Sequence, residues 1–487
     1  MKKILEMGVL LSAERDPNRL LDQILSCVME LAHCDGGTLY LLDGDALRFK
    51  IMRTDSLGAR SGGDGRDPEL PPVELKRENV CALALLEDRT LRIRDVYHDP
   101  NYDFTGPIAY DTLTGYHTQS MLVVPMRGRE GERVGVLQLI NALDRAGNVC
   151  EFSGEMALVL ESVATQAAIT IQNVRYIREI RELFYSFVRV MSAAIDERSP
   201  YNANHSRRMA ACGGRFVDFL NAQAVSEGRE ALFSPQHREE FLMSVWLHDI
   251  GKLTTPLEIM DKAERLSPLQ KAEVRHRLET IRLQGRIDCL EGRITAGARD
   301  ALEEEVRETE EKLDQMGSAG FLSDGQLAWL AGVRERTYID GAGQARPWLT
   351  DEEYAMLSIR KGTLSAGERK VMENHVVVTD RLLSQIDFPS DLAHVRSWAG
   401  AHHEFLNGSG YPNHLTEEAI APEVRILTIL DIFDALVADD RPYKPGMPVE
   451  RALAILTDMA RKEGKLDPDL TARFIASRCW EEAPEAR

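Results

Sequence analysis

Two neighbouring residues near the middle of the chain, His248 and Asp249, have the side chains of a metal site. They follow the apolar segment Val245-Trp246-Leu247, which favours a helix, and Gly251 ends that helix and presents Lys252. An imidazole nitrogen and a carboxylate suit a borderline divalent cation, and a carboxylate can bridge two such ions. A lone pair of this kind is as often a surface turn or a capping pair, so further ligands must accompany it.

A second pair, His402 and His403, stands ahead of a loop punctuated by Gly408 and Gly410. Two consecutive histidines are hard to explain by packing alone. The glycines let the backbone turn and approach a ligand closely, and Pro412 stiffens the exit from the loop. The segment therefore predicts metal ligands followed by a ligand-binding loop.

Three further candidates, His205, His375 and Asp431, would each more often be a satisfied polar residue than a ligand. Together with the two pairs they match one pattern, because His-Asp-Ile-Gly-Lys precedes His-His-Glu-x-x-x-Gly-x-Gly-Tyr-Pro in the chain. With this pattern the chain resembles the HD-GYP family over about residues 185–265 and 358–475. The resemblance implies an all-helical domain with two or three metal ions, commonly iron or manganese, that hydrolyses cyclic di-GMP to the linear dinucleotide or onward to GMP.

The resemblance also assigns the site residue by residue. It implies two divalent ions per chain, Fe or Mn, one held by His205, His248 and Asp431, the other by His375, His402 and His403, with Asp249 between them. Asp249 and Lys252 are the expected catalytic residues, because an ammonium group can neutralise a phosphoryl oxygen as charge develops there. The expected substrate contacts are Lys252, Gly408, Gly410, Tyr411, Pro412, Arg441 and Lys444. The alternative for Arg441 and Lys444 is a solvated surface pair.

One position departs from the family pattern. Members with three metals carry a Glu four residues before the first His, where this chain has Tyr201. A phenol is a poor substitute for a bridging carboxylate. We therefore expect two metals and the linear dinucleotide pGpG as the main product, with GMP as the product of a further step.

The first third of the chain reads as an α+β sensor domain. A helical apolar pattern over residues 20–32, closed by Gly36-Gly37, is followed by a strand hairpin over residues 38–52 and a polar loop over residues 54–75. Two more strands, 121–126 and 134–140, flank a polar turn.

This part resembles GAF domains over roughly residues 5–175, on the stretch from Gly115 to Met126 and the strand that ends at Asn141. The resemblance implies a GAF fold. Asn141 is followed by Ala142-Leu143-Asp144 and not by the Asn-Lys-x-Phe-Asp-Glu element of GAF domains that bind cyclic nucleotides. We therefore prefer dimerisation or an unknown ligand as its role, with cyclic nucleotide sensing as the alternative.

A long helix is predicted between the two domains, over residues 156–198. Its apolar residues recur every three or four positions, which predicts pairing with the same helix of a second subunit in a parallel coiled coil. The alternative is packing against its own GAF domain. The positions are Leu158, Val159, Val163, Ala167, Ile171, Val174, Ile177, Ile180 and Leu183.

An insertion of about a hundred residues separates the His-Asp pair from the helix expected over residues 362–383. Residues 267–316 predict a charged antiparallel helical hairpin around residues 292–297, acting as a lid, a dimer contact or a docking arm. The glutamate run at 303–311 is its expected solvated face, and His276 is not an expected ligand. The two apolar faces expected to meet are Leu278, Ile281, Ile287 and Leu290 on one helix and Leu302, Val306 and Leu313 on the other.

Bulk composition limits the remaining possibilities. The net charge of −19 argues against a duplex-DNA partner, and seven scattered cysteines without CxxC pairing indicate neither a disulfide framework nor a cysteine zinc site. No uncharged apolar run approaches the ~20 residues that span a bilayer. We therefore expect a cytoplasmic protein without a membrane span.

The sequence thus predicts a multidomain chain: an N-terminal α+β GAF sensor domain (1–155), a long connecting helix (156–198) and a C-terminal all-α HD-superfamily (HD-GYP) domain (199–487) with a helical-hairpin insertion at about 267–358. The expected function is a metal-dependent cyclic di-GMP phosphodiesterase regulated by the GAF domain, acting as a homodimer through the GAF domain and the connecting helix. The alternatives are a non-catalytic cyclic di-GMP receptor or protein-docking module, and an HD phosphohydrolase acting on another cyclic dinucleotide.

Overall fold

The computed structural model describes residues 16–63, 67–198, 204–438 and 446–481. The chain divides into two compact units between Phe184 and Tyr185. Each unit has its own hydrophobic core. No helix within the described ranges combines the length and the apolar character that a membrane crossing requires.

The first unit opens with helix α2, Pro17–Ala32. The carboxylate of Asp16 accepts hydrogen bonds from the backbone N–H groups of Asn18 and Arg19, which caps the helix start. The helix buries an apolar face that includes Leu25 and packs it on the sheet. The predicted helix is present.

The predicted helix stop at Gly36 and Gly37 is wrong. Helix α2 ends at Ala32, with His33 in the left-handed region at φ 47°, and both glycines lie in strand β1, Cys34–Asp43. A Cβ atom at Gly37 would stand 2.8 Å from Leu25 Cδ1. Glycine is therefore required at that position by the close approach of α2 to the strand.

The sheet of the first unit is antiparallel, with strand order β3-β2-β1-β7-β6-β5. The predicted hairpin is β1 with β2, Ala46–Thr54, and the later predicted strands are β6, Met121–Arg127, and β7, Arg133–Leu143. The interpretation of 54–75 as a loop is wrong in part. Within it lie β3, Ala59–Gly62, and β4, Val73–Glu74, because the exposed edge of β2 pairs with backbone groups whatever the side chains are.

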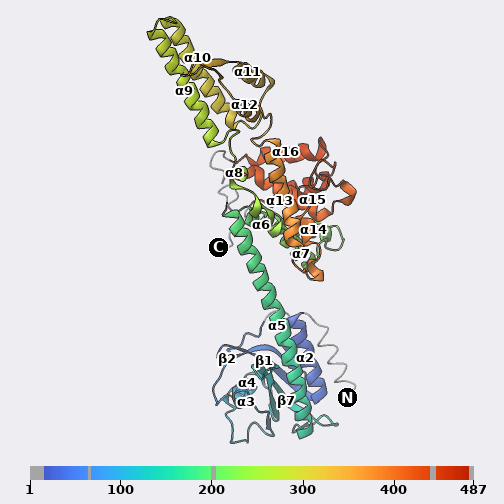
Figure 1. Ribbon diagram of the computed structural model, residues 1–487. Helices are drawn as coiled ribbons and strands as arrows, with labels where there is room; N and C mark the ends of the chain where they lie inside the picture. Colours follow the sequence, from blue (N-terminus) through green and yellow to red (C-terminus); the bar gives the residue numbers. More distant parts are fainter. Residues whose placement is uncertain (1–15, 64–66, 199–203, 439–445, 482–487) are drawn as a thin grey trace. The chain divides into compact units, whose positions relative to one another are not determined.

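The remaining elements of this unit were not predicted. Helices α3, Val80–Glu87, and α4, Thr105–Thr114, and strand β5, Leu91–Ile93, come between β4 and β6, and β8, Val149–Cys150, pairs with β7. The unit holds two apolar clusters. One brings α2 and the first turns of α5 together with sheet residues, and the other includes α3 and Phe104. In Figure 1, α2 and α5 lie side by side against the sheet.

The predicted connecting helix is α5, Gly154–Asp196, which is unbroken over 43 residues. Its first turns belong to the core of the first unit through residues such as Leu160 and Ala164. Its last turns lie in the second unit, where Val188 and Ile195 are buried. Between them an apolar stripe is exposed to 50% or more of each side chain: Tyr176, Ile180, Leu183, Phe187 and Val190. The first part of α5 therefore packs against the domain that precedes it in the chain, as the alternative interpretation predicted. The exposed stripe has no such contact within the described residues.

The second unit is built of helices. Its elements in chain order are α6, His205–Ser226; α7, Pro235–Leu247; the 3-10 turn η1, Ile250–Thr254; α8, Leu257–Met260; α13, Ala366–Leu383; η2, Ser390–Leu392; α14, Val395–Ala399; η3, Glu417–Ala419; α15, Pro422–Val437; α16, Val449–Arg461; and α17, Pro468–Ser477. Its core packs Phe216 of α6 and Phe241 of α7 with Phe433 of α15 and Phe474 of α17. These helices bring the candidate ligands together from distant parts of the sequence.

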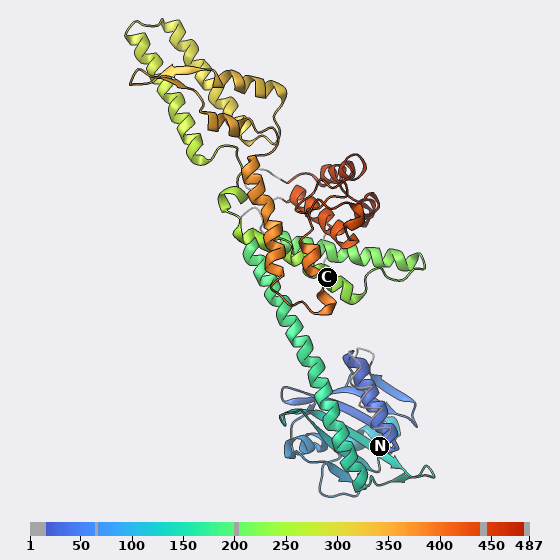
Figure 2. The ribbon, with the colours of Figure 1, turned by 45° about the vertical axis from the view of Figure 1, so that its right-hand side comes forward.

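The predicted insertion forms a helical hairpin with further elements behind it. Helices α9, Pro268–Leu290, and α10, Ala296–Ser318, lie side by side in Figures 1 and 2. After them come α11, Asp324–Arg334, the two-stranded β9, Thr337–Ile339, with β10, Ala345–Pro347, and α12, Asp351–Leu357, none of which was predicted. The insertion has its own apolar core, which contains Leu278, Ile281, Val306 and Leu313.

Two of the residues expected in the interface between these helices are not there. Ile287 is 44% exposed and Leu290 is 88% exposed. A Cβ at Gly285 would meet Leu302 Cδ2 at 2.7 Å, so the hairpin is still closely packed at that level. Both residues lie in the last turn of α9, next to the exposed connection to α10.

Candidate metal centre

The His248-Asp249 pair stands at a junction between two helices. Helix α7 ends at Leu247 and the tight turn η1 begins at Ile250. The prediction that Gly251 ends the helix is wrong, because Gly251 lies within η1. A Cβ there would stand 1.9 Å from the backbone oxygen of His375, so this glycine is required by direct contact between η1 and α13.

A threonine on α13 fixes the same contact. The backbone N–H of Gly251 donates to Thr379 Oγ1 at 3.0 Å, and the Thr379 hydroxyl donates to the backbone oxygen of His248 at 3.0 Å. The junction and α13 are therefore held together, which brings His375 beside His248 and Asp249.

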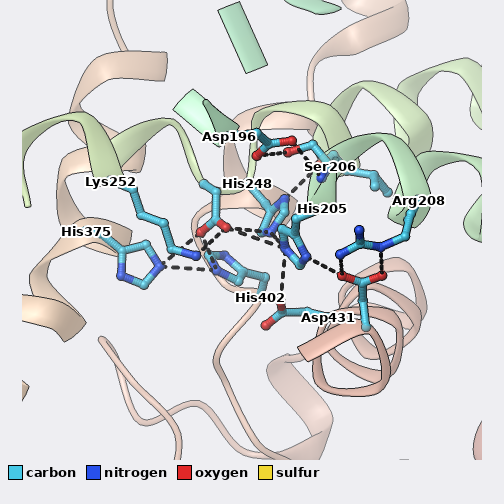
Figure 3. A network of polar contacts seen from close by, with 12 residues as sticks. Asp196, His205, Ser206, Arg208, His248, Lys252, His375, His402 and Asp431 are labelled. Carbon is cyan, nitrogen blue, oxygen red and sulfur yellow. Dashed lines mark hydrogen bonds and ion pairs between the residues drawn. The ribbon is translucent and has the colours of Figure 1, made fainter. Parts of the chain in front are cut away.

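One group of donor atoms gathers around His205 and His248. The two Nε2 atoms lie 3.3 Å apart, and His248 Nε2 lies 3.2 Å from Asp249 Oδ2. Asp431 Oδ1 of α15 lies 3.4 Å from His205 Nε2. All four side chains are buried, and Figure 3 shows three of them, His205, His248 and Asp431, close together.

A second group consists of His375, His402 and His403, each of which offers one ring nitrogen within 4.8 Å of the others. The Nε2 atoms of His375 and His402 lie 3.5 Å apart, and the rings of His402 and His403 are 4.1 Å apart between centroids. His403 Nδ1 is also 3.7 Å from Asp431 Oδ2. Asp431 therefore lies between the first group and His403.

Asp249 lies between the two groups. Its Oδ2 faces His248, and its Oδ1 is 3.4 Å from His375 Nε2 and 3.9 Å from His402 Nε2. That Oδ1 atom is fully buried and accepts no hydrogen bond from the described residues. A buried carboxylate oxygen without a donor, facing two imidazole nitrogens, fits a bound cation.

Contacts at Nδ1 orient the rings of three histidines, so that the opposite ring nitrogen, Nε2, points into the centre. The Nδ1 atoms of three histidines lie 2.6–2.7 Å from the backbone oxygen three residues earlier in the chain: His248 from Val245, His375 from Met372 and His402 from Ala399. Such contacts fix the tautomer of a metal-binding imidazole and leave Nε2 unprotonated for the metal.

His205 is oriented by a carboxylate that sequence reasoning missed. Its Nδ1 lies 2.7 Å from Asp434 Oδ2, and the guanidinium of Arg208 donates to both Asp434 oxygens at 2.8 and 3.0 Å. Asp434 is buried. The available signal was its spacing, since a residue three positions after Asp431 lies on the same face of α15.

Charges around the centre set the protonation states. Burial opposes ionisation of Asp249, yet His248 and Lys252 hold its pKa well below the usual range. Burial and the neighbouring His403 hold the pKa of His402 well below its ordinary value, and burial, with His375 beside it, lowers the pKa of His403 to about 4. These are the ionised carboxylate and neutral imidazoles that a divalent cation requires.

His205 differs from these histidines. Although burial opposes it, hydrogen bonding to Asp431 and Asp434 raises the pKa of His205 to about 10. A cation that binds at this ring must therefore displace a proton at neutral pH.

Lys252 reaches the centre from η1. Its Nζ donates to Asp249 Oδ2 at 2.6 Å, and the side chain is 17% exposed. Burial opposes its charge, but Asp249 raises the pKa of Lys252 above the ordinary value. Lys252 is therefore a fixed positive charge beside the Asp249 carboxylate.

The glycine loop after His403 is held beside the same centre. A Cβ at Gly410 would meet the backbone nitrogen of Phe405 at 2.4 Å, which explains glycine there. The backbone N–H of Tyr411 donates to the backbone oxygen of His403, and the two rings are 4.8 Å apart. Gly408, with φ 74°, requires the left-handed conformation.

A second residue that was given no role in the sequence, Glu404, organises this loop. Its buried carboxylate accepts the backbone N–H groups of Asn413 and Leu415 at 2.7 and 2.9 Å. The loop, including Pro412, is thus fixed before any ligand binds. Arg441, Lys444 and Tyr201 lie outside the described residues.

Comparison with known proteins gives two family matches. The GAF domain family matches residues 16–171, and the HD domain family matches residues 352–470. The HD match contains His375, His402, His403 and Asp431 and begins only near the end of the insertion.

Three relatives match parts of the chain. The 3'3'-cGAMP-specific phosphodiesterase 3 of Vibrio cholerae is 39% identical over 20% of this chain and 21% of its own length. The cyclic di-GMP phosphodiesterase response regulator RpfG of Xanthomonas campestris is 30% identical over 47% of this chain and 62% of its own length. A cyclic di-GMP phosphodiesterase of Thermotoga maritima is 34% identical over 24% of this chain and 31% of its own length. The chain thus spans less than two thirds of each relative.

Both resemblances seen in the sequence are confirmed at the level of domains. An HD domain implies divalent metal binding, and the His and Asp groups described above have the donors for it. The chain carries a GAF domain over residues 16–171, followed by a domain of the HD family matched over residues 352–470.

Proposed function

We propose that this chain is a metal-dependent phosphodiesterase that hydrolyses cyclic di-GMP to the linear dinucleotide pGpG under the control of its GAF domain. The position of Asp249 carries the proposal. Its Oδ2 is 3.2 Å from His248 Nε2 and its Oδ1 is 3.4 Å from His375 Nε2, so one carboxylate faces both histidine groups. This is the arrangement that a pair of ions sharing one carboxylate requires.

The proposed ion count is two per chain, as Fe or Mn. Five imidazoles and two carboxylates form a donor set that suits two octahedral ions. Divalent cations bound there would supply Lewis acidity toward a phosphodiester. The proposed ligands are His205, His248 and Asp431 for one ion, His375, His402 and His403 for the other, and Asp249 for both.

The remaining proposed roles belong to side chains around these ligands. Lys252, partly buried and charged, would neutralise a phosphoryl oxygen as negative charge develops on it. Tyr411 and the loop from Gly408 to Pro412 lie next to His403 and would contact the substrate. Arg441 and Lys444 are proposed to grip its phosphates.

A second substrate, 3'3'-cGAMP, is favoured by a specific observation. A relative named for that substrate is 39% identical to this chain over 99 residues. Both dinucleotides contain the same kind of phosphodiester bond, so the metal centre alone does not distinguish them. The bases must be distinguished by residues around the Gly408 loop.

The test is turnover of both dinucleotides by protein purified under conditions that preserve ferrous iron, with metals counted on the same sample. Wild type is expected to convert cyclic di-GMP to pGpG, and Asp249→Ala is expected to do so at less than about one hundredth of the rate. Asp218→Ala, which breaks an exposed pair with Arg238, is the matched control and is expected to behave as wild type.

Two outcomes would contradict parts of the proposal. Absence of turnover by fully metallated wild type would leave a non-catalytic receptor as the better description. Three metals per chain would contradict the two-ion assignment that rests on Tyr201.

We also propose that the protein is a homodimer in which α5 pairs with α5 of a second copy. The exposed stripe Tyr176, Ile180, Leu183, Phe187 and Val190 has steps of four, three, four and three residues. That alternation is the spacing of coiled-coil core positions. A second copy offers the same stripe in the same register, which supports a parallel pair.

A further inference from the structure

The last turn of α5 is joined to two elements that carry residues of the metal centre. Asp196 ends the helix, and Arg198 follows it in a turn. Asp196 bonds to the start of α6, and Arg198 bonds to η1. Neither residue offers its side chain to the candidate ligands directly, so any effect they have must pass through these two elements.

Asp196 completes the start of helix α6. Asn204, the residue before the helix, is in the left-handed region and provides no side-chain cap. The buried Asp196 carboxylate accepts the backbone N–H of Ser206 and the Ser206 hydroxyl instead, both at 3.1 Å (Figure 3). A carboxylate that satisfies a first-turn N–H stabilises a helix start as a cap does. Asp196 therefore fixes the turn that carries His205.

Arg198 holds the turn that carries Lys252. Its Nη1 donates to the backbone oxygen of Lys252 at 3.0 Å and also to that of Leu253. The Lys252 oxygen also accepts the backbone N–H of Thr255 at 3.0 Å, so Arg198 adds a second, charged donor at the end of η1. On its other side, η1 contacts α13 through Gly251 and Thr379. The turn is therefore held from both α5 and α13.

These contacts connect α5 directly with α6, which begins at His205, and with η1, which carries Lys252. The early turns of the same unbroken helix, through Leu160 and Ala164, belong to the core that contains the GAF sheet. A rotation or shift of α5 that moved Asp196 and Arg198 would pull on α6 and η1. His205 and Lys252 would then move relative to Asp249.

We propose that Asp196 and Arg198 are positioning residues that couple α5 to the metal centre, Asp196 through His205 and Arg198 through Lys252. The expected effect of this coupling on kcat rests on the proposed function, whereas its expected effects on hydrogen exchange and metal retention do not. Both can therefore be measured separately.

The structural test is hydrogen exchange in the full-length, metal-free protein, followed in peptides that cover residues 249–256. Arg198→Ala is expected to speed exchange there by about tenfold or more, because hydrogen bonds from a charged donor contribute about 1.5–3 kcal/mol. The matched control is Arg189→Ala, because Arg189 is an exposed arginine of α5 that donates to the neighbouring Ser186 hydroxyl and not to η1. Equal exchange in Arg198→Ala and Arg189→Ala would overturn the role of Arg198.

Asp196 has a separate test that does not need activity. Asp196→Ala is expected to lose metal to a chelator about tenfold faster than wild type, since a change in support of a ligand commonly weakens metal binding by that order. Asp196→Asn, which can still accept from Ser206, is expected to recover most of the difference. Loss of metal at the wild-type rate by Asp196→Ala would overturn its role.

Kinetics then tests the coupling itself. With full metal occupancy, Arg198→Ala is expected to lower kcat and kcat/KM together by about tenfold, because Lys252 acts on charge that develops in the transition state. Arg198→Lys, which keeps one donor, is expected to recover part of kcat. Faster exchange with unchanged kcat would contradict the coupling. No turnover in wild type would contradict the proposed function instead, and the exchange result would stand.

Discussion

The ring of His205 is held by a carboxylate, whereas those of His248, His375 and His402 are held by backbone oxygens. A carboxylate behind an imidazole strengthens the ring as a metal ligand. Asp434 is itself held by two hydrogen bonds from Arg208. The strength of the first ligand group thus depends on a residue outside it.

Asp434→Ala should weaken metal binding by about 10- to 100-fold, the usual effect of removing such a partner. The measurement is metal content per chain at increasing chelator concentration. Asp218→Ala is the matched control, because Asp218 also accepts two bonds from an arginine, Arg238, but does so at the surface. Metal retention equal to that of the control would show that Asp434 does not support the site.

Lys252→Met should lower kcat by about 10²- to 10³-fold, the range seen when one donor to a developing negative charge is removed. Methionine keeps the length of the side chain and removes the charge that faces Asp249. Metal content should change little, since Lys252 is not a proposed ligand. A Lys252→Met variant with the kcat of wild type would show that the Lys252 charge has no role in catalysis.

The seven ligands were predicted through the resemblance to the HD-GYP family, which the adjacent His-Asp and His-His pairs made recognisable. The structure brings all seven together, although their roles remain proposals. Asp434 and Glu404 were not identified as supporting residues. Asp434 stands three positions after Asp431 and so on the same face of α15, but this spacing alone does not show that its carboxylate contacts His205. Gly251 was interpreted as a helix end, because a sequence does not show that α13 approaches it.

At the scale of elements, the start of α13 has two stabilising devices. Ser365 and Glu368 form a reciprocal cap, and Lys262 donates to Glu368 Oε1 at 2.7 Å. Burial opposes ionisation of Glu368, but Lys262 and the Ser365 backbone lower its pKa below 4.5. Because α13 carries His375, these devices also support the metal centre.

Glu368→Gln should therefore reduce stability in a pH-dependent way. A carboxyl with a lowered pKa contributes stability that is fully present above its unfolded pKa and is lost as pH falls through the folded pKa. We expect a deficit of about 1 kcal/mol at pH 7 that shrinks below pH 4.5. Urea unfolding at several pH values measures it, with Glu179→Gln, from an exposed pair with Arg175, as control. A deficit that does not change with pH would exclude the ion pair as its cause.

Elements with a clear apolar pattern were predictable and those without one were not. Helix α2 and strands β1 and β2 have apolar residues at regular positions, and β6 and β7 are mainly apolar runs on either side of a polar turn. Helix α3 is apolar nearly all round, which hides its period, and β3 is polar and exposed at the sheet edge. Such edge strands form because the backbone N–H and C=O groups of the neighbouring strand need hydrogen-bond partners. This requirement produces no side-chain pattern in the sequence.

At the scale of the whole molecule, the exposed stripe on α5 carries the proposed dimer. Replacing Ile180 and Leu183 together by Glu should convert dimer to monomer, because four like charges would then meet at the helix pair. Light scattering after size-exclusion chromatography measures the mass. Arg178→Glu, five residues from Leu183 and so on the other side of the helix, is the control. A double variant that stays dimeric would place the dimer contact elsewhere.

The insertion should be removable without loss of the metal centre. It has its own core, and the chain on either side of it is tied together, with Arg265 donating to the backbone oxygen of Ile359 and Thr363 to that of Lys262. Replacing residues 267–358 by a short Gly/Ser linker, which keeps both of these contacts, should therefore leave metal content and the unfolding midpoint of the rest unchanged. A variant that folds without metal would show that the insertion supports the ligands.

The same junction has an evolutionary consequence. Since the chain leaves and rejoins the rest of the helical domain at one place, between Lys262 and Thr363, a single recombination event could add or delete the whole insertion as a cassette. No compensating change in the core around Phe216 and Phe474 would be needed, because that core contains no residue of the insertion. Descendants of one ancestral protein could thus differ by an entire module while inheriting the same group of histidines and aspartates.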